Sequence, residues 1–259
     1  MLIGSVFTTS TGLQAASTYL NVTGNNIANA STTGFKAQET NFNDLLYTGS
    51  LPGANSSGVT PATGAQLGTG TAVNATTGNF TQGSLEQTGQ QYDLAINGNG
   101  FFKVTLADGT FAYTRDGSFS VDASGQLVTS EGYLVAGPST VPSGTTSVTI
   151  GADGTVTATT PTGTQSLGQI TLTNFSNPDG LSRFGSDLFT ATPASGAPID
   201  GTAEANGLGS ITQGSLESSN VSLSTELVNL IIAQSASSFN SQALSVEDQT
   251  LSDTAQLVQ

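Results

Sequence analysis

Apolar residues recur at seven-residue spacing near both ends of the chain, among uncharged polar residues. Because seven residues are close to two helical turns, this spacing places them along one side of a helix and is typical of a coiled-coil seam. The pattern predicts a helix with an apolar seam at each end, and we expect the two helices to pair. A single hairpin of the two helices would also satisfy both seams. The predicted subunit-interface residues are Val6, Leu13, Leu20 and Ile27 in the first helix, and Leu223, Leu230, Leu244 and Leu251, with Leu227 on the adjacent row, in the second.

The limits of both helices follow from residues that favour or oppose helix. Asn and Thr residues precede Gly34, which tolerates the left-handed conformation after a helix, and Phe35 is placed for the apolar contact that accompanies such an end. The first helix is therefore predicted to end near residues 30–33. The second begins after a serine N-cap, has Glu226 in its first turn, and continues without Gly or Pro for roughly 35 residues.

Between the helices the pattern changes to an alternation of apolar and polar residues, interrupted by five Asp-Gly pairs. Asp-Gly favours tight hairpin turns, and short alternating runs between such turns are typical of an all-β sandwich or barrel. The predicted strands are 92–96, 101–106, 110–114, 118–121, 126–129, 133–136, 147–150, 155–159 and 170–174.

A six-residue sequence, Thr-Gln-Gly-Ser-Leu-Glu, occurs twice, at 81–86 and at 212–217. The copies bracket the β-rich stretch, so we expect the chain to enter and leave the β domain through paired segments. The predicted fold class is α+β, with paired N- and C-terminal helices of coiled-coil type, an inserted all-β domain and an extended connector. The predicted divisions are 1–35 for the first helix, 36–86 for the connector, 87–211 for the β domain and 212–259 for the return segment and second helix.

Residues 45–85 contain no Asp, Glu, Lys or Arg and show no periodicity, and Gly, Ser, Thr, Ala and Pro dominate their first half. Taken alone, this composition is typical of a flexible linker. Unstructured loops of this length are uncommon inside compact folds, so the stretch is either disordered or ordered by a neighbour.

Charged side chains make up 8% of the 259 residues, against about 25% in ordinary soluble domains, and the formal net charge is −14. With 4 basic residues the chain cannot form a basic patch, so nucleic acid and anionic membrane are excluded as partners. The N-terminus has no basic segment before its first apolar residues, so no cleaved secretory signal is expected. The first charged residue is Lys36, and a helix without charges favours packing on several sides.

The chain has few groups suited to catalysis, because it contains neither Cys nor His. Asp116 and Asp122 flank a short predicted strand and lack the dense oxygen ligands of a calcium loop, so we interpret them as turn residues. A Ser–Lys pair needs Lys36 or Lys103, of which the first follows a predicted helix end and the second lies in strand alternation. We therefore expect no catalytic site, no bound metal and no cofactor.

Several motifs, in order along nearly the whole chain, resemble the flagellar axial family of rod and hook proteins. The N-terminal motif is Gly-Asn-Asn-Ile-Ala-Asn followed by Thr-Gly-Phe-Lys, and its family residues are Asn25, Asn26, Asn29, Gly34 and Phe35. Further segments that look like family motifs are 98–102, 113–119 and 125–129 in the β domain and 219–221, 226–231 and 233–234 near the C-terminal helix. The segments similar to those that distinguish distal rod subunits are 44–47, 52–54 and 66–70.

The resemblance implies a structural subunit that self-assembles into the hollow, rigid drive shaft of the distal rod, which transmits torque from motor to hook and conducts exported subunits. It implies uncleaved type III export to a rod that spans the periplasm, without membrane insertion. The implied partners are further copies of the chain, proximal rod proteins, the hook protein and the surrounding L- and P-ring proteins. Alternatives are a proximal rod or hook subunit of the same family and, from other classes, a secreted β-rich adhesin or a glycan hydrolase, which turnover abolished by changing Asp116 would support.

Overall fold

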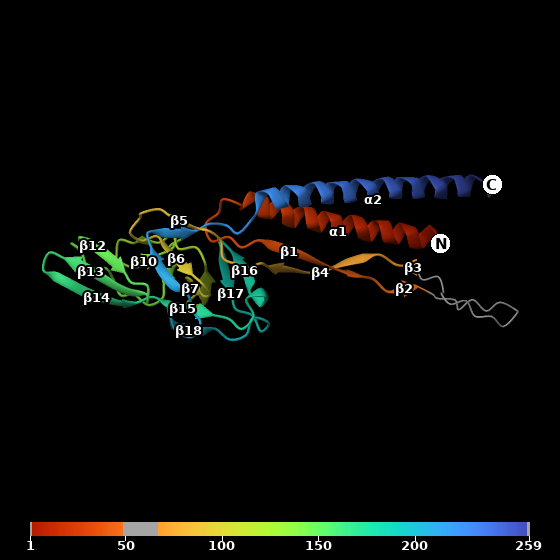
Figure 1. Ribbon diagram of the computed structural model, residues 1–259. Helices are drawn as coiled ribbons and strands as arrows, with labels where there is room; N and C mark the ends of the chain where they lie inside the picture. Colours follow the sequence, from red (N-terminus) through yellow and green to blue (C-terminus); the bar gives the residue numbers. More distant parts are fainter. Residues whose placement is uncertain (1, 49–66, 258–259) are drawn as a thin grey trace. The chain divides into compact units, whose positions relative to one another are not determined.

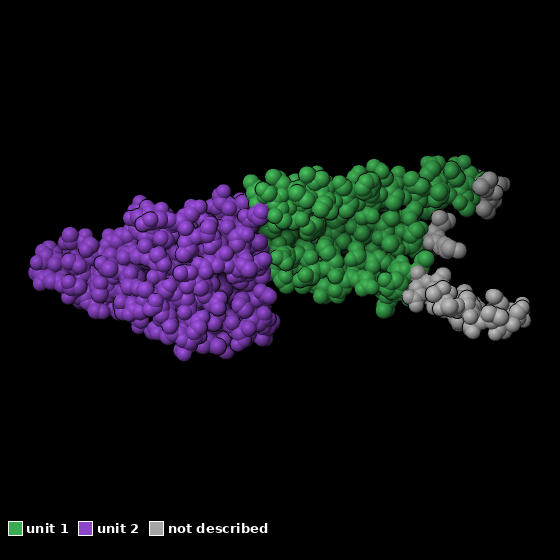
Figure 2. Space-filling model, in the orientation of Figure 1, with its two compact units in different colours: residues 1–27, 38–77, 223–259 green, residues 28–37, 78–222 purple. Residues whose placement is uncertain are grey.

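The computed structural model describes residues 2–48 and 67–257 (Figure 1). The chain divides into two compact units (Figure 2). Unit 1 contains residues 1–27, 38–77 and 223–259, and unit 2 contains residues 28–37 and 78–222. Unit 2 therefore extends beyond both limits of the predicted β domain, 87–211. It also includes the short segment 28–37, which follows the first helix. The resembling segment 52–54 and most of 45–70 lie outside the described residues.

Unit 1 consists of two helices and a two-stranded ribbon, with α1 (Leu2–Ala28) lying between α2 (Leu223–Leu257) and the ribbon (Figure 1). The helices are antiparallel, because Thr9 contacts Glu247 while Asn26 contacts Glu226. The length of α2 is 35 residues, which confirms the prediction. α1 ends at Ala28, before the predicted 30–33, because a turn closed by the Thr32 amide and the Asn29 carbonyl follows it at once.

The described part of the predicted connector forms a ribbon of short antiparallel strands. Strand β1 (Gln38–Asp44) pairs with β4 (Thr71–Gly78), and β2 (Tyr47–Thr48) pairs with β3 (Leu67–Gly68). An isolated two-stranded ribbon is marginal in water, and this one packs on α1, where the rings of Tyr19 and Phe42 meet edge to face at 5.9 Å. The described residues of the connector are therefore ordered by packing against α1 of the same chain.

Unit 2 is built from antiparallel strands and one 3₁₀ turn, Pro178–Gly180. A nine-stranded sheet has the order β16-β17-β8-β7-β11-β10-β9, with β15 joining β7 to β18; a three-stranded sheet has the order β12-β13-β14. The strands of the large sheet are β7 (Phe101–Thr105), β8 (Phe111–Thr114), β9 (Ser120–Val121), β10 (Leu127–Val128), β11 (Leu134–Val135), β15 (Thr171–Asn174), β16 (Ser182–Gly185), β17 (Leu188–Thr190) and β18 (Ile199–Thr202). The others are β12 (Ser147–Ile150), β13 (Thr155–Thr160) and β14 (Gly163–Gln169), with the pairs β6 (Leu94–Asn97)–β19 (Ser210–Gln213) and β5 (Leu85–Gln87)–β20 (Ser215–Glu217).

The predicted pairing of the repeated hexapeptides is confirmed by the register of β5 and β20. Leu216 of the second copy lies opposite Glu86 of the first, and Glu217 lies opposite Leu85. The stretch of chain between the two hexapeptides supplies the buried residues of two hydrophobic clusters. The larger combines residues of the nine-stranded sheet, such as Leu172, with residues of the β6–β19 pair, such as Ile96, and of the three-stranded sheet. The smaller contains the aromatic residues Phe101, Tyr113, Phe175 and Phe189.

Candidate assembly surface

The side of α2 that contacts α1 has residues at alternating three- and four-residue spacing, as expected of a helix seam. The contacts to α1 come from Glu226, Asn240 and Glu247, so much of this seam is polar. The predicted interface residues Leu230 and Leu244 lie in the same row and are half-buried within the chain. The complete row is Glu226, Leu230, Ala233, Ser237, Asn240, Leu244 and Glu247.

The other predicted residues divide into half-buried and exposed positions. On α1, Val6, Leu13, Leu20 and Ile27 are half-buried, while the fully buried apolar positions of this helix include Ala16 and Val22. On α2, the exposed predicted residues are Leu223, Leu227 and Leu251. Their participation in contacts between subunits remains a prediction.

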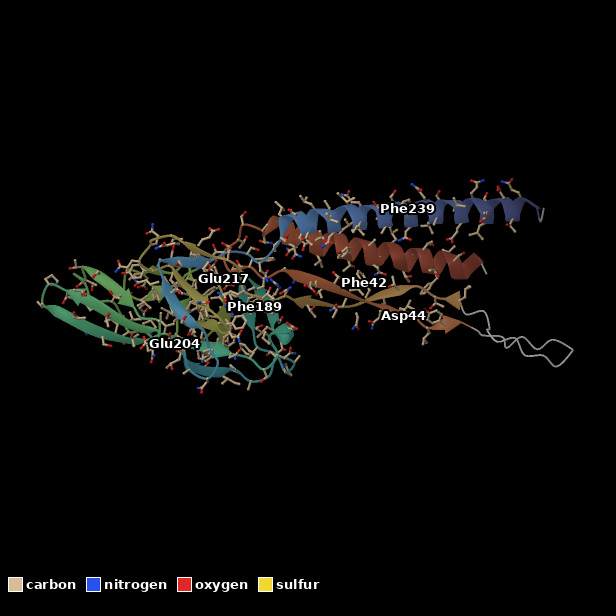
Figure 3. The ribbon with its side chains drawn as sticks, viewed as in Figure 1. Phe42, Asp44, Phe189, Glu204, Glu217 and Phe239 are labelled. Atoms are coloured by element: carbon tan, nitrogen blue, oxygen red, sulfur yellow. The ribbon has the colours of Figure 1, made fainter. Side chains whose placement is uncertain are left out.

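The outer side of α2 carries large apolar side chains that the sequence reasoning missed. Phe239 is 68% exposed and lies in the middle of the helix (Figure 3). Ile232 and Val246 precede and follow it at seven-residue spacing, so the same periodicity that revealed the predicted seam also marks this second row. Between Leu227 and Val246 the helix has no charged residue. The exposed apolar residues of this outer face are Val228, Ile231, Ile232, Phe239 and Val246.

A groove of about 400 Å³ opens where α2 passes the first turns of α1. Three of the predicted interface residues, Val6, Leu244 and Leu251, supply its apolar lining. Its remaining lining residues are Ser241, Ser245 and Asp248. The groove thus brings together predicted residues from both helices.

Asn26 of the N-terminal motif joins three elements of unit 1. The side chain is buried, and its Nδ2 donates to the Gln38 carbonyl at 2.8 Å and to Glu226 Oε1 at 3.2 Å. Its Oδ1 accepts from the Gln38 amide at 2.9 Å. The side chain of Asn26 therefore pairs with both backbone polar groups of Gln38, the first residue of β1, as a neighbouring strand would. The same side chain also contacts α2 through Glu226. Asn25 lies on the exposed side of α1.

The rest of the motif lies in unit 2. Asn29 accepts a hydrogen bond from the Thr32 hydroxyl at 3.2 Å in the turn after α1. Gly34 has φ +70°, and a Cβ there would lie 2.5 Å from the Asp116 amide nitrogen, so both conformation and space require glycine. Phe35 is buried, with the Arg183 guanidinium 5.2 Å from its ring centre. These contacts anchor the motif to the β-rich unit.

Lys36, which completes the motif, belongs to a buried ion cluster centred on Glu217. Lys36 and Glu217 are both fully buried; Lys36 Nζ donates to Glu217 Oε1 at 2.6 Å, and Arg115 Nη1 donates to Oε2 at 3.2 Å. The Gly83 amide also donates to Glu217 Oε1, at 2.8 Å. Burial lowers the pKa of Lys36 even though Glu217 opposes that effect, and burial likewise lowers the pKa of Arg115. The cluster links residues 181 positions apart, which no local sequence pattern could reveal.

Asp116 and Asp122, interpreted from the sequence as turn residues, occupy turns in the structure. The side-chain oxygens of Asp116 accept from the amide and hydroxyl of Ser118, and those of Asp122 accept from the amides of Ser124 and Gln126. Burial raises the pKa of Asp116. Burial, followed by the charge of Asp116, raises the pKa of Asp187 to about 6. Among residues 2–48 and 67–257, no group of three or more acidic side chains could hold a metal ion.

Comparison with known proteins identifies the family. Residues 8–36 match the family described as flagella basal body rod protein, and residues 212–257 match the flagellar basal body rod FlgEFG protein C-terminal family. Residues 95–158 match the flagellar hook protein FlgE/F/G D1 domain. The flagellar basal-body rod protein FlgG of Buchnera aphidicola subsp. Schizaphis graminum is 45% identical over 99% of this chain and 100% of its own length. The chain belongs to the flagellar rod and hook protein family.

Other relatives place the chain within that family. FlgG of Borreliella burgdorferi is 41% identical over 96% of this chain and 97% of its own length. The flagellar hook protein FlgE of Escherichia coli is 24% identical over 93% of this chain and 96% of its own length. The chain is therefore a structural subunit of the flagellar basal-body rod and not an enzyme. Neither helix, over the residues described, is long and apolar enough to cross a membrane.

Proposed function

We propose that the chain is a distal rod subunit that self-assembles into a hollow, rigid helical drive shaft. The observation that carries this proposal is the exposed apolar outer face of α2, whose side chains are 55–68% exposed. Contiguous exposed apolar surface marks an association site. The net charge of −14 opposes association elsewhere, whereas the uncharged helices meet without repulsion.

In this proposal residues 1–35 and 212–259 form an inner layer of coiled-coil packing, residues 87–211 form the outer layer, and residues 36–86 connect them. The absence of charged residues from α1 suits the wall of a conduit, because a neutral wall does not hold a passing chain electrostatically. The partners are further copies of the chain, proximal rod proteins, the hook protein and the L- and P-ring proteins. The chain reaches the periplasm by type III export without cleavage, and the shaft transmits torque to the hook.

Electron microscopy of basal bodies from cells that lack this chain tests the proposal. We expect a rod that stops short, without hook or outer ring, and full-length rods when the wild-type chain is restored. A complete rod without a hook would instead make the chain a hook subunit. Intact basal bodies with full filaments would remove the rod assignment and leave the adhesin alternative.

The predicted seams are tested in the same cells with Leu20→Asp and Leu230→Asp. Both leucines are half-buried within unit 1, so a carboxylate there opposes helix packing. We expect neither variant to restore the rod, while unit 2 keeps its fold because both positions lie in unit 1. A rod of normal length formed by either variant would contradict the seam argument.

A further inference from the structure

The groove beside α2 and the exposed ring of Phe239 are complementary apolar features on different sides of α2. The groove has a volume of about 400 Å³ and an apolar lining from Val6, Leu244 and Leu251. Phe239 is the most exposed aromatic residue among those the structure describes, at 68%. Each feature is costly in water, because one exposes an aromatic ring and the other an apolar hollow.

The groove is large enough to take a phenyl ring. An apolar cavity of about 150 Å³ is sufficient to bind benzene, so a groove of 400 Å³ accepts one ring and part of the helix that carries it. Among the described residues that line the groove, Asp248 is the one that carries a charge. A carboxylate is a suitable neighbour for the positively polarised edge of an aromatic ring.

Phe239 cannot fill the groove of its own chain. Leu244 follows it by five residues on the same helix, which places the two side chains roughly 140° apart around the helix axis. Leu251 lies further along the helix, about 18 Å from Phe239 at 1.5 Å per residue. The ring that enters the groove therefore belongs to a different molecule.

A second copy of the chain is the occupant that the charge distribution favours. The stretch from Leu227 to Val246 has no charged residue, so two copies of a chain with net charge −14 can meet there without opposing carboxylates. The ring and the groove lie roughly 140° apart around the axis of α2, so one two-fold interface does not contain both, and the contact is heterologous. Heterologous contacts generate rings or open helical polymers, not closed two-fold dimers.

We propose that Phe239 of one copy inserts into the groove between Val6, Leu244 and Leu251 of a neighbouring copy. This contact rests on the proposed self-assembly and specifies the surface that performs it. It assigns Leu244 and Leu251 a role in a contact between copies, and it adds a ring that the predicted interface did not include. Each copy offers one ring and one groove, so every added copy restores both features at the growing end.

Disulfide trapping tests the contact directly, because the chain has no cysteine of its own. Purified Phe239→Cys and Leu244→Cys chains are mixed, concentrated and oxidised, and cross-linked pairs containing one of each are measured. Disulfides form when the two Cβ atoms come within about 4.5 Å. The matched control is Ile231→Cys mixed with Leu244→Cys, because Ile231 is 61% exposed on the same helix. We expect pairs from the first mixture and few from the second.

Polymerisation of the purified chain gives a second measurement. We expect Phe239→Ala to raise the concentration needed for sedimentable polymer on the order of tenfold or more, as removal of a central aromatic contact does. Ile231→Ala should change it much less. Phe7, which is 53% exposed on α1, is a second exposed ring that could compete for the groove. Equal cross-linking of the two mixtures, a pairing of Phe7→Cys with Leu244→Cys in preference to Phe239→Cys, or polymerisation of Phe239→Ala at the wild-type concentration would overturn the contact.

The experiments distinguish failure of the Phe239 contact from failure of the proposed rod function. A wild-type chain that stays monomeric and gives no cross-links at any concentration also overturns the contact, yet shortened rods in cells without the chain would still support a rod subunit. Conversely, specific cross-links together with intact basal bodies in such cells would support the contact and remove the rod assignment.

Discussion

Replacing Glu217 by Gln should destabilise unit 2 strongly while changing no side-chain volume. The carboxylate is fully buried and accepts hydrogen bonds from Lys36 at 2.6 Å, Gly83 at 2.8 Å and Arg115 at 3.2 Å. The amide of Gln leaves two cations buried without an opposite charge. Breaking a buried ion pair from one side costs about 3–5 kcal/mol, which is a large fraction of the roughly 5–15 kcal/mol that stabilises a typical domain.

The assay is thermal unfolding followed by the near-ultraviolet circular dichroism of the aromatic cluster in unit 2. A loss of this size corresponds to a fall of roughly 10 °C in melting temperature for a unit of this size. Glu86→Gln is the matched control, because Glu86 occupies the same position in the first hexapeptide but is exposed. Its effect should stay within about 0.5 kcal/mol. Equal effects of the two variants would refute the reasoning.

Three further substitutions test other contacts. Gly34→Ala should destabilise unit 2 by about 3 kcal/mol or more in denaturant unfolding, because its Cβ meets the backbone of Asp116 and its φ is +70°; Gly109→Ala, with φ +83° and open space, should cost about 1 kcal/mol. Asp187→Asn should raise the stability of unit 2 by about 1 kcal/mol at pH 8 and leave it unchanged at pH 4. The reason is that the folded-state pKa of Asp187, about 6, lies above the unfolded value of 3.8. The stability contributed by Asp187 is therefore complete below pH 4 and is lost as the pH rises through 6. Asn26→Ala should lower the melting temperature of the helices, measured at 222 nm, by the loss of three hydrogen bonds worth about 2–3 kcal/mol together, whereas the exposed Asn21→Ala should not; equal melting of the two variants would contradict the role of Asn26.

The sequence predicted the elements that depend on neighbouring residues. Both helices follow from seven-residue spacing, and the Asp-Gly pair at Asp108 lies in the turn that joins β7 to β8. The strands β16 and β17 were missed although they form a local hairpin, because β17 also pairs with β8, far away in the chain, and such tertiary contacts rather than local alternation stabilise them. The ribbon was missed for a similar reason, since its order depends on the surface of α1.

The same distinction applies to the candidate site. Leu230 and Leu244 could be found from spacing, but spacing alone could not tell that α1 of the same chain half-buries them. Phe239 shares a seven-residue row with Ile232 and Val246, so the sequence spacing already indicated this row. It was missed because the parallel row of leucines was interpreted as the helix seam. The partners of Lys36 could not be found, because Arg115 and Glu217 approach it only in the folded unit.

The ion cluster also sets the order in which unit 2 can fold. Its two closing contacts join residues separated by 181 and 102 positions, and such long chain closures make folding slow. A chain that emerges with its N-terminus first lacks Glu217 until more than four-fifths of it has been released, and until then Lys36 and Arg115 have no buried counter-charge. The charge-balanced core of unit 2 can therefore form only after the second hexapeptide has been released.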